Sequence, residues 1–166
     1  NSPHIVEPQE FLGPRHFCFH PSLDILYFSN EQGCSVSGYR LDTTKGTLSL
    51  FQTLTTLPVD YSDSNTCSQI QITTAGTLLY VPNRGHNSMA GFTVDSAGIL
   101  TSAGQIPTEA VPSAFSLDTT GNFLFAAGSA SDRLAAYRVT SDTGSLALLD
   151  TYEVGKRPME VLTISF

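Results

Sequence analysis

Three charged residues, Arg15, Glu31 and Arg84, have the types needed to hold an anionic ligand and to move a proton. A guanidinium group binds a carboxylate or phosphate through two parallel hydrogen bonds. A carboxylate placed between two such groups can polarise water or exchange a proton. The competing interpretation is an Arg–Glu ion pair that only fixes the start of a strand. The choice depends on the elements that carry the three residues.

These elements belong to an internal repeat. Segments 14–58, 67–108 and 112–155 align with one another, and the first interval is lengthened by the polar insertion PVDYSDSNT at 58–66. The anchors are apolar or aromatic residues that recur at fixed offsets: Leu26, Leu79 and Leu124; Tyr27, Tyr80 and Phe125; Tyr39, Phe92 and Tyr137; Leu48, Leu100 and Leu146.

Each copy contains four short runs rich in β-branched and aromatic residues, separated by turn sequences such as TTAG and DTTG. No window shows a sustained helical period. Four antiparallel strands in a repeat of about 40–50 residues are typical of a β-propeller blade. A two-sheet sandwich is the alternative, but it does not require the third copy to resemble the first two. The sequence predicts an all-β propeller with three four-stranded blades.

Closed propellers have about 4–8 blades, so three whole blades predict a partial propeller. We expect residues 1–166 to form one domain, with 1–12 as the outer strand of a preceding blade and 157–166 as the inner strand of a closing blade. Two blade faces would then be open. They would need either further blades or self-association to cover them.

In an antiparallel blade the start of the first strand lies beside the end of the second strand. This rule places Arg15 next to Glu31, and it brings Arg84 from the neighbouring blade to the same end. The equivalent positions of the other copies hold Ser68, Ser113 and Ser129. The framework repeats while these positions do not, as is expected when a site is built on a scaffold. Arg15, Glu31 and Arg84 are therefore the candidate catalytic residues.

Two histidines are candidate substrate-binding residues together with Arg15 and Arg84. His16 follows Arg15 on the first strand, and His86 follows Arg84 in the sequence RGHN. The alternatives are a hydrogen-bonded histidine between blades for His16 and a solvated loop residue for His86. His20, in an HP turn, is predicted to be structural.

No metal or cofactor is predicted, because the four histidines lack HxH or HExxH spacing. Asp60 and Asp63 resemble a calcium loop only loosely, since the glycine and terminal glutamate of an EF-hand are missing. A calcium- or zinc-dependent propeller remains a third, weaker hypothesis.

Composition excludes several classes of partner. The net charge of −7 and the lack of a basic run argue against nucleic acid and anionic membranes, and no apolar stretch is long enough to span a bilayer. The first residues, NSPHIVEPQ, do not resemble a signal peptide. Cys18, Cys34 and Cys67 show no CxxC spacing and predict reduced, mostly buried thiols in a cytoplasmic protein.

Several motifs resemble a known family over residues 5–166. GPRHFCFHP, LYFSNE, SVSGYRLD, LPVDYSDSN, LYVPNRGHNSMAGF and VGKRPMEV are similar in order and spacing to lactonase-type seven-bladed propellers. That family contains bacterial 6-phosphogluconolactonases and fungal carboxymuconate cyclases. The resemblance implies that about half of the family's chain precedes residue 1, including a blade that supplies a further site histidine.

By this resemblance, Arg15, Glu31 and Arg84 fall on the family's site in the central channel, and a small anionic lactone of a sugar acid or phosphosugar is the implied substrate. The arginines would orient its anionic group and stabilise the oxyanion of the opening ring, with Glu31 as general acid or base. A cyclase would use the same groups to hold a dicarboxylate.

Two positions depart from the family pattern. The family commonly has an arginine and a glutamine where this sequence has Ser113 and Ser129. Their loss weakens the anion pocket, so the sequence also admits a changed or inactive propeller that acts by binding a partner.

Overall fold

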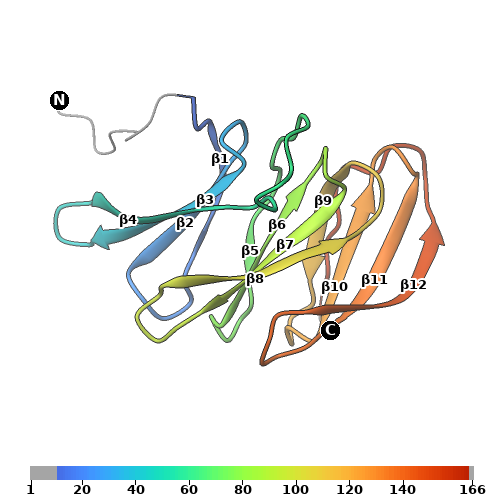
Figure 1. Ribbon diagram of the computed structural model, residues 1–166. Coiled ribbons are helices and arrows are strands. Elements are labelled where there is room, and N and C mark those ends of the chain that lie inside the picture. The colour runs from blue at the N-terminus through green and yellow to red at the C-terminus, as the bar shows by residue number, and fades with distance from the viewer. Residues whose placement is uncertain (1–10, 165–166) are drawn as a thin grey trace.

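A computed structural model describes residues 11–164 and shows three antiparallel sheets that lie side by side in chain order (Figure 1). Each sheet has four strands, arranged in the order of the chain. The first consists of β1 (Pro14–Phe19), β2 (Ile25–Asn30), β3 (Ser35–Asp42) and β4 (Thr47–Thr55). The second consists of β5 (Gln71–Ile72), β6 (Leu78–Asn83), β7 (Ser88–Val94) and β8 (Leu100–Pro107). The third consists of β9 (Pro112–Leu117), β10 (Phe123–Gly128), β11 (Arg133–Val139) and β12 (Leu146–Glu153).

The fan of three four-stranded sheets confirms the predicted all-β, partial-propeller fold. Within residues 11–164 there is no α-helix. The predictions for the chain ends fall partly outside this range, because residues 1–10 and 165–166 are not described. Residues 158–164 are described without a strand, but Thr163 Oγ1 donates to the carbonyl of Leu117 on β9 at 2.6 Å. Strands at 1–12 and 157–166 stay predictions.

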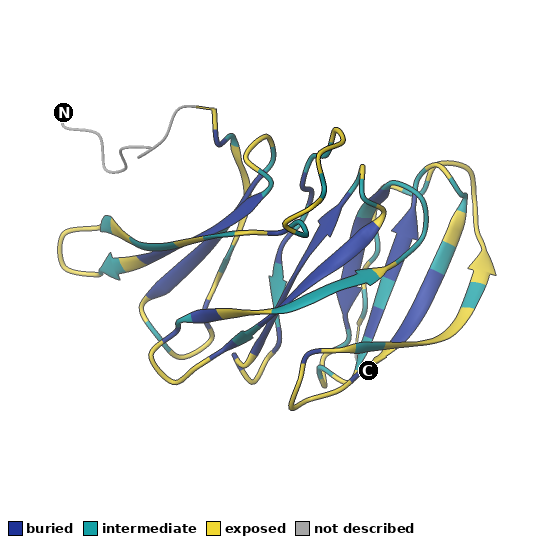
Figure 2. Cartoon of the chain, viewed as in Figure 1, coloured by how far each residue is buried: buried dark blue, intermediate teal, exposed yellow. Residues whose placement is uncertain are grey.

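The core lies between the sheets because the middle sheet is buried on both faces, as the dark strands β6 and β7 in Figure 2 show. Successive side chains of a strand point to opposite faces. Leu79 and Val81 accordingly pack toward the first sheet, while Leu78 and Tyr80 pack toward the third. This double burial explains why β6 reads LLYVPN rather than alternating with polar residues.

A tyrosine hydroxyl joins each of the first two sheets to the next one. Tyr27 on β2 donates to the carbonyl of Gly98 at 2.7 Å, and Tyr80 on β6 donates to the carbonyl of Gly144 at 2.9 Å. Gly98 has a φ of +79°, and a Cβ there would lie 2.2 Å from Ile25 Cδ1. The turn therefore needs glycine to approach the tyrosine so closely. The equivalent residue of the third sheet is Phe125, which has no hydroxyl.

We expect Tyr80→Phe to lower the free energy of unfolding by about 1–2 kcal/mol, because the buried carbonyl of Gly144 would lose its donor. Urea denaturation measures the change. Tyr152→Phe is the matched control, since Tyr152 is 50% exposed, and it should leave stability unchanged. Equal effects of the two substitutions would contradict the assigned role of the Tyr80 hydroxyl.

Candidate functional site

The site is built on the turns that follow the second strand of each sheet. These turns span 31–34, 84–87 and 129–132, so Glu31, Arg84 and Ser129 are their first residues. In two copies a buried asparagine precedes the turn. Asn30 Nδ2 donates to Ser35 and Ser37, and Asn83 Nδ2 donates to Ser88 and to the carbonyl of Thr56.

Arg15 is oriented by a β-bulge at the start of β1. Pro14 pairs with Asn30 and His16 pairs with Ser29, which leaves Arg15 out of register. A bulge redirects the side chain of its extra residue. The third sheet repeats the irregularity, because Gly128 pairs with Pro112 and Ala127 with Ala114, leaving Ser113 unpaired there.

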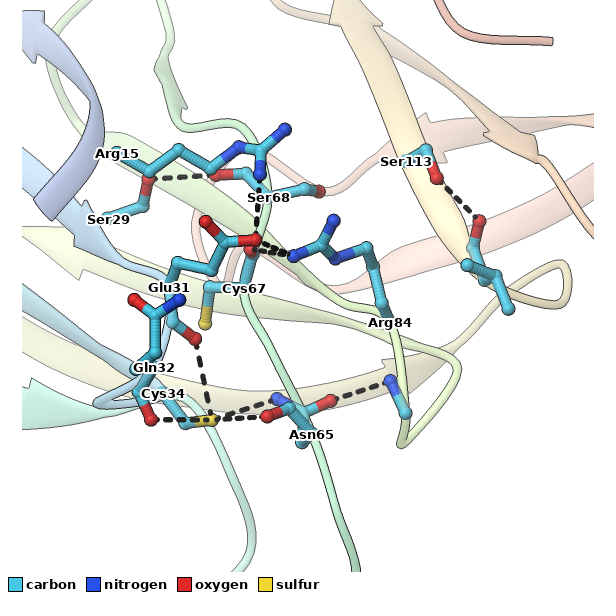
Figure 3. Close-up of polar contacts among 12 residues, drawn as sticks. Arg15, Ser29, Glu31, Gln32, Cys34, Asn65, Cys67, Ser68, Arg84 and Ser113 are labelled. Carbon is cyan, nitrogen blue, oxygen red and sulfur yellow. Dashed lines mark hydrogen bonds and ion pairs between the residues drawn. The ribbon is translucent and has the colours of Figure 1, made fainter. Parts of the chain in front are cut away.

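The structure brings Arg15, Glu31 and Arg84 together (Figure 3). Arg15 Nη1 donates to Glu31 Oε1 at 2.7 Å, and Arg84 Nη2 donates to the same oxygen. The Glu31 side chain is 21% exposed, so the ion pairs remain accessible to a ligand. Glu31 Oε2 accepts no hydrogen bond from residues 11–164. One carboxylate oxygen is thus held while the other is open.

The two guanidinium groups keep Glu31 ionised. Partial burial alone would raise the pKa of Glu31, but hydrogen bonds from Arg15 and Arg84, together with their positive charges, outweigh that effect and lower it. The carboxylate therefore carries its charge at neutral pH, and it can accept a proton rather than donate one.

Glu31 does not use all the N–H groups of the Arg84 guanidinium. Its Nη2 also donates to the carbonyl of Cys67 at 3.2 Å. Its Nε is buried and has no hydrogen-bond partner in the described part of the chain. A buried donor without a partner is costly, and an anionic group bound beside Arg84 would satisfy it.

The third sheet presents hydroxyl groups where its neighbours present charges. Ser113 Oγ and Ser129 Oγ lie 2.9 Å apart, and both hydroxyls donate to the carbonyl of Val111 at 3.2 Å. Figure 3 shows Ser113 away from the Arg15–Glu31–Arg84 cluster. The charged part of the site is therefore confined to the first two sheets.

The histidines do not join the cluster. His16 is exposed on β1, and its ring has no hydrogen bond to Glu31, Arg15 or Arg84. His86 Nδ1 lies 2.8 Å from Ser88 Oγ, and its ring packs edge-on against Tyr61 at 4.7 Å. Substrate binding by His16 or His86 stays a prediction.

His20 is buried and holds a turn. Its Nδ1 accepts from the backbone N–H groups of Ser22 and Leu23, and its Nε2 lies 3.1 Å from the carbonyl of Gly76 in the second sheet. These contacts give it the structural role that the sequence predicts.

Asn30 and Asn83 were not among the predicted residues, although the sequence holds a signal for them. They precede the charged residues as NE and NR, whereas the third copy has Gly128 before Ser129. A buried amide thus accompanies a charge at the next position.

Within residues 11–164, no three His, Cys, Asp or Glu side chains are grouped so that they could hold a metal ion. The same residues include no helix with the length and apolar character needed to cross a membrane.

The family model and the curated relatives agree on one family. Residues 2–163 match the family described as "Lactonase, 7-bladed beta-propeller". The 6-phosphogluconolactonase of Yersinia pestis is 39% identical over 150 residues, which are 90% of this chain and 45% of the relative. That of Pectobacterium carotovorum is 38% identical over 154 residues, 92% of this chain and 46% of the relative.

Solved structures agree in fold. A Lactobacillus plantarum protein superposes with a TM-score of 0.89 and 29% identity over 93% of this chain and 46% of its own. The periplasmic gluconolactonase of Pseudomonas aeruginosa has a TM-score of 0.85 and 24% identity, covering 91% of this chain and 42% of that one. The chain spans less than half the length of the curated relatives it matches.

Proposed function

The chain belongs to the lactonase family of seven-bladed β-propellers, and we propose that its Arg15, Glu31 and Arg84 form the site that hydrolyses a small anionic lactone. The observation that carries this proposal is the ionised Glu31 carboxylate, held through Oε1 by guanidinium groups from two neighbouring sheets. The relatives named 6-phosphogluconolactonase support a sugar-acid or phosphosugar lactone as the substrate.

Each group has a defined task in the proposed reaction. Arg15 and Arg84 bind the anionic group of the substrate or the oxyanion that forms when water adds to the lactone carbonyl. Glu31 accepts a proton from that water through Oε2 and returns it to the ring oxygen as the C–O bond breaks. The product is the open hydroxy acid. No metal enters these steps.

The neutral Ser113–Ser129 pair favours a substrate with hydroxyl groups at the third sheet and its single anionic group near Arg84. We therefore propose that a lactone with one anionic group, a phosphate or a free carboxylate, is turned over in preference to a neutral, unphosphorylated sugar-acid lactone. Assaying both lactones with the same preparation gives the preference. Lactone formation from a muconate, without lactone hydrolysis, would instead assign the site to the cyclase reaction.

Arg84→Ala should reduce kcat/KM for lactone hydrolysis in the full-length protein by about 10²–10³-fold, the range seen when a transition-state hydrogen-bond donor is removed. Arg84→Lys should recover only part of the rate, because an ammonium group keeps the charge but not the planar pair of donors. Arg138→Ala is the control, since Arg138 stacks on Phe123 away from the site. A rate unchanged by Arg84→Ala would count against the site.

We further propose that other propeller blades, from the same protein or from a second copy, cover the open face of the first sheet. Phe17 and Phe19 on β1 are each 55% exposed, and Phe17 packs against Phe28 of β2. Light scattering on the 166-residue chain tests self-association. A stable monomer of 17.8 kDa would exclude a second copy as the cover.

A cytoplasmic location is part of the same proposal. The three cysteines are free, which suits a reducing compartment. Cell fractionation with an antibody against the protein would test the location directly.

A further inference from the structure

Each turn of the site ends in a residue with a positive φ, and in the first sheet the type of that residue is unusual. Asn87 and Asp132 end their turns with φ values of 53° and 56°, and Cys34 ends its turn with a φ of 44°. Among residues other than glycine, asparagine and aspartate enter this region most readily. A cysteine has no such preference, so Cys34 occupies a position whose backbone favours another residue.

Asn87 and Asp132 use their side chains to hold the segment that leads to the next sheet. Asn87 Oδ1 accepts the N–H of Val111, and Asp132 Oδ1 accepts the N–H of Arg157, both at 2.8 Å. Cys34 Sγ performs the equivalent task, accepting from Asn65 Nδ2 at 3.3 Å. The thiol of Cys34 in turn faces the carbonyls of Asn65, Gln32 and Glu31, at 3.3, 3.8 and 3.9 Å from Sγ.

A second thiol lies on that same connecting segment. Cys67 is fully buried, with its Sγ 3.2 Å from Thr56 Oγ1 and 3.6 Å from Asn83 Oδ1. It packs in the same cluster as the half-buried Cys34. Asn65 links the two thiols, because its Nδ2 donates both to Cys34 Sγ at 3.3 Å and, at 3.1 Å, to Asn83 Oδ1, the oxygen that Cys67 Sγ contacts. The nearby Cys67 thiol and the Asn65 amide lower the pKa of Cys34 despite partial burial, while the nearby Cys34 and burial raise the pKa of Cys67.

We propose that Cys34 and Cys67 form a dithiol site that is oxidised by hydroperoxides, with Cys34 as the attacking sulfur and Cys67 as the resolving one. Low-pKa, accessible cysteines next to a second thiol are the ones that react in this way. The inference concerns the thiols alone and does not depend on the proposed lactonase activity.

The chemistry balances without another reactant. The Cys34 thiolate attacks one oxygen of the peroxide, the O–O bond breaks, and the leaving oxygen takes a proton to depart as water or an alcohol. Cys34 is then a sulfenic acid. The Cys67 sulfur displaces its hydroxyl group, which leaves as water with the Cys67 proton. The two sulfurs lose two electrons in total, and the peroxide gains them.

The disulfide would connect turn 31–34 of the charged cluster to the segment 65–67, which in turn contacts turn 84–87. The carbonyl of Glu31 accepts the N–H of Cys67 at 3.0 Å, three residues before Cys34. Asn65, which holds Cys34 in the reduced protein, also accepts the N–H groups of Gly85 and His86 through Oδ1 at 2.8 and 3.1 Å. Oxidation would break the hydrogen bond between Cys34 and Asn65, which Figure 3 shows side by side. Because Asn65 also binds Gly85 and His86, both turn 31–34 and turn 84–87 would be altered.

Cys18 supplies an internal control, because burial raises its pKa to about 12. In the reduced 166-residue chain at pH 7, we expect Cys34 to react with iodoacetamide at least about tenfold faster than Cys18, in line with their thiolate fractions. Equal rates at the two sites would overturn the proposal. This measurement needs no substitution, so it cannot be confused by misfolding.

The second measurement reads the product. The chain is treated with one equivalent of hydrogen peroxide, blocked with N-ethylmaleimide and digested without reductant. Mass spectrometry should find the Cys34 and Cys67 peptides joined, two hydrogen atoms lighter than their sum, with Cys18 alkylated. Cys67→Ser should stop the reaction at a sulfenic acid on Cys34 that dimedone traps, whereas Cys18→Ser should leave the disulfide unchanged. Absence of the joined peptides in the unsubstituted chain would refute the inference.

Discussion

Glu31→Gln lowers the rate of lactone hydrolysis by about 10²–10⁴-fold, the range typical of a lost general base. The amide has the shape of the carboxylate but cannot accept a proton from water. It also removes the charge that Arg15 and Arg84 share. Initial rates in the full-length protein, followed by acid release at constant pH, give the size of the loss.

Glu109→Gln is the matched control for this substitution. Glu109, in the connection between β8 and β9, also pairs with an arginine, Arg133 of the third sheet, at 3.7 Å. Its replacement should leave the rate unchanged. A Glu31→Gln protein that hydrolyses the lactone as fast as the Glu109→Gln protein would remove Glu31 from the mechanism.

The pH dependence follows from the lowered pKa of Glu31. A base with a lowered pKa stays ionised in mildly acidic solution, so kcat/KM should persist below pH 4.5, the ordinary value of a glutamate, and fall only in more acidic solution. The stability that the two ion pairs contribute is likewise present above the ordinary pKa and lost as the pH falls through the lowered one. An acid limb above pH 4.5 would show that another group titrates.

Asn83→Ala lowers the free energy of unfolding by about 3 kcal/mol, because several buried polar groups lose partners together. Asn83 Oδ1 accepts from Thr56 Oγ1 at 2.8 Å and from Asn65 Nδ2 at 3.1 Å, and Nδ2 donates to the carbonyl of Thr56 at 2.8 Å. Alanine replaces none of these contacts. Urea denaturation monitored by circular dichroism measures the loss.

Asn122→Ala provides the comparison for Asn83→Ala, since Asn122 is exposed in a turn of the third sheet. Its free energy of unfolding should stay within about 0.5 kcal/mol of the unsubstituted value. If Asn83→Ala also stays within that range, the buried amide is not what fixes the turn that carries Arg84.

The fold could be predicted because the repeat encodes it in apolar anchors. Leu26, Leu79 and Leu124 are buried at equivalent places in the second strand of each sheet. The sequence does not predict where the first strand of the second sheet begins. Its first strand is only Gln71–Ile72, and Cys67 pairs with Asn83 as an isolated bridge ahead of that strand.

The juxtaposition of Arg15, Glu31 and Arg84 could also be predicted, since it follows from antiparallel pairing and from the repetition of the blade. The position of His86 could not. Its ring is directed by contacts with Tyr61 and Ser88, and Tyr61 lies in an insertion that has no counterpart in the other copies.

The adjacency of Cys34 and Cys67 could not be predicted from the sequence either. The sequence spacing of the two cysteines is irregular, and only the course of the connecting segment brings the thiols together. The sequence predicted mostly buried thiols, and the structure buries Cys67 fully and Cys18 and Cys34 in part.

The tyrosine hydroxyls that join neighbouring sheets can reach their acceptors only after most of the next sheet has been translated. Tyr27 precedes its acceptor Gly98 by 71 residues, and Tyr80 precedes Gly144 by 64. On the ribosome each sheet therefore emerges before the partner that completes it, and it must wait for roughly one further repeat to be translated. The first and the second sheet therefore each gain this contact only after most of the following sheet has been made.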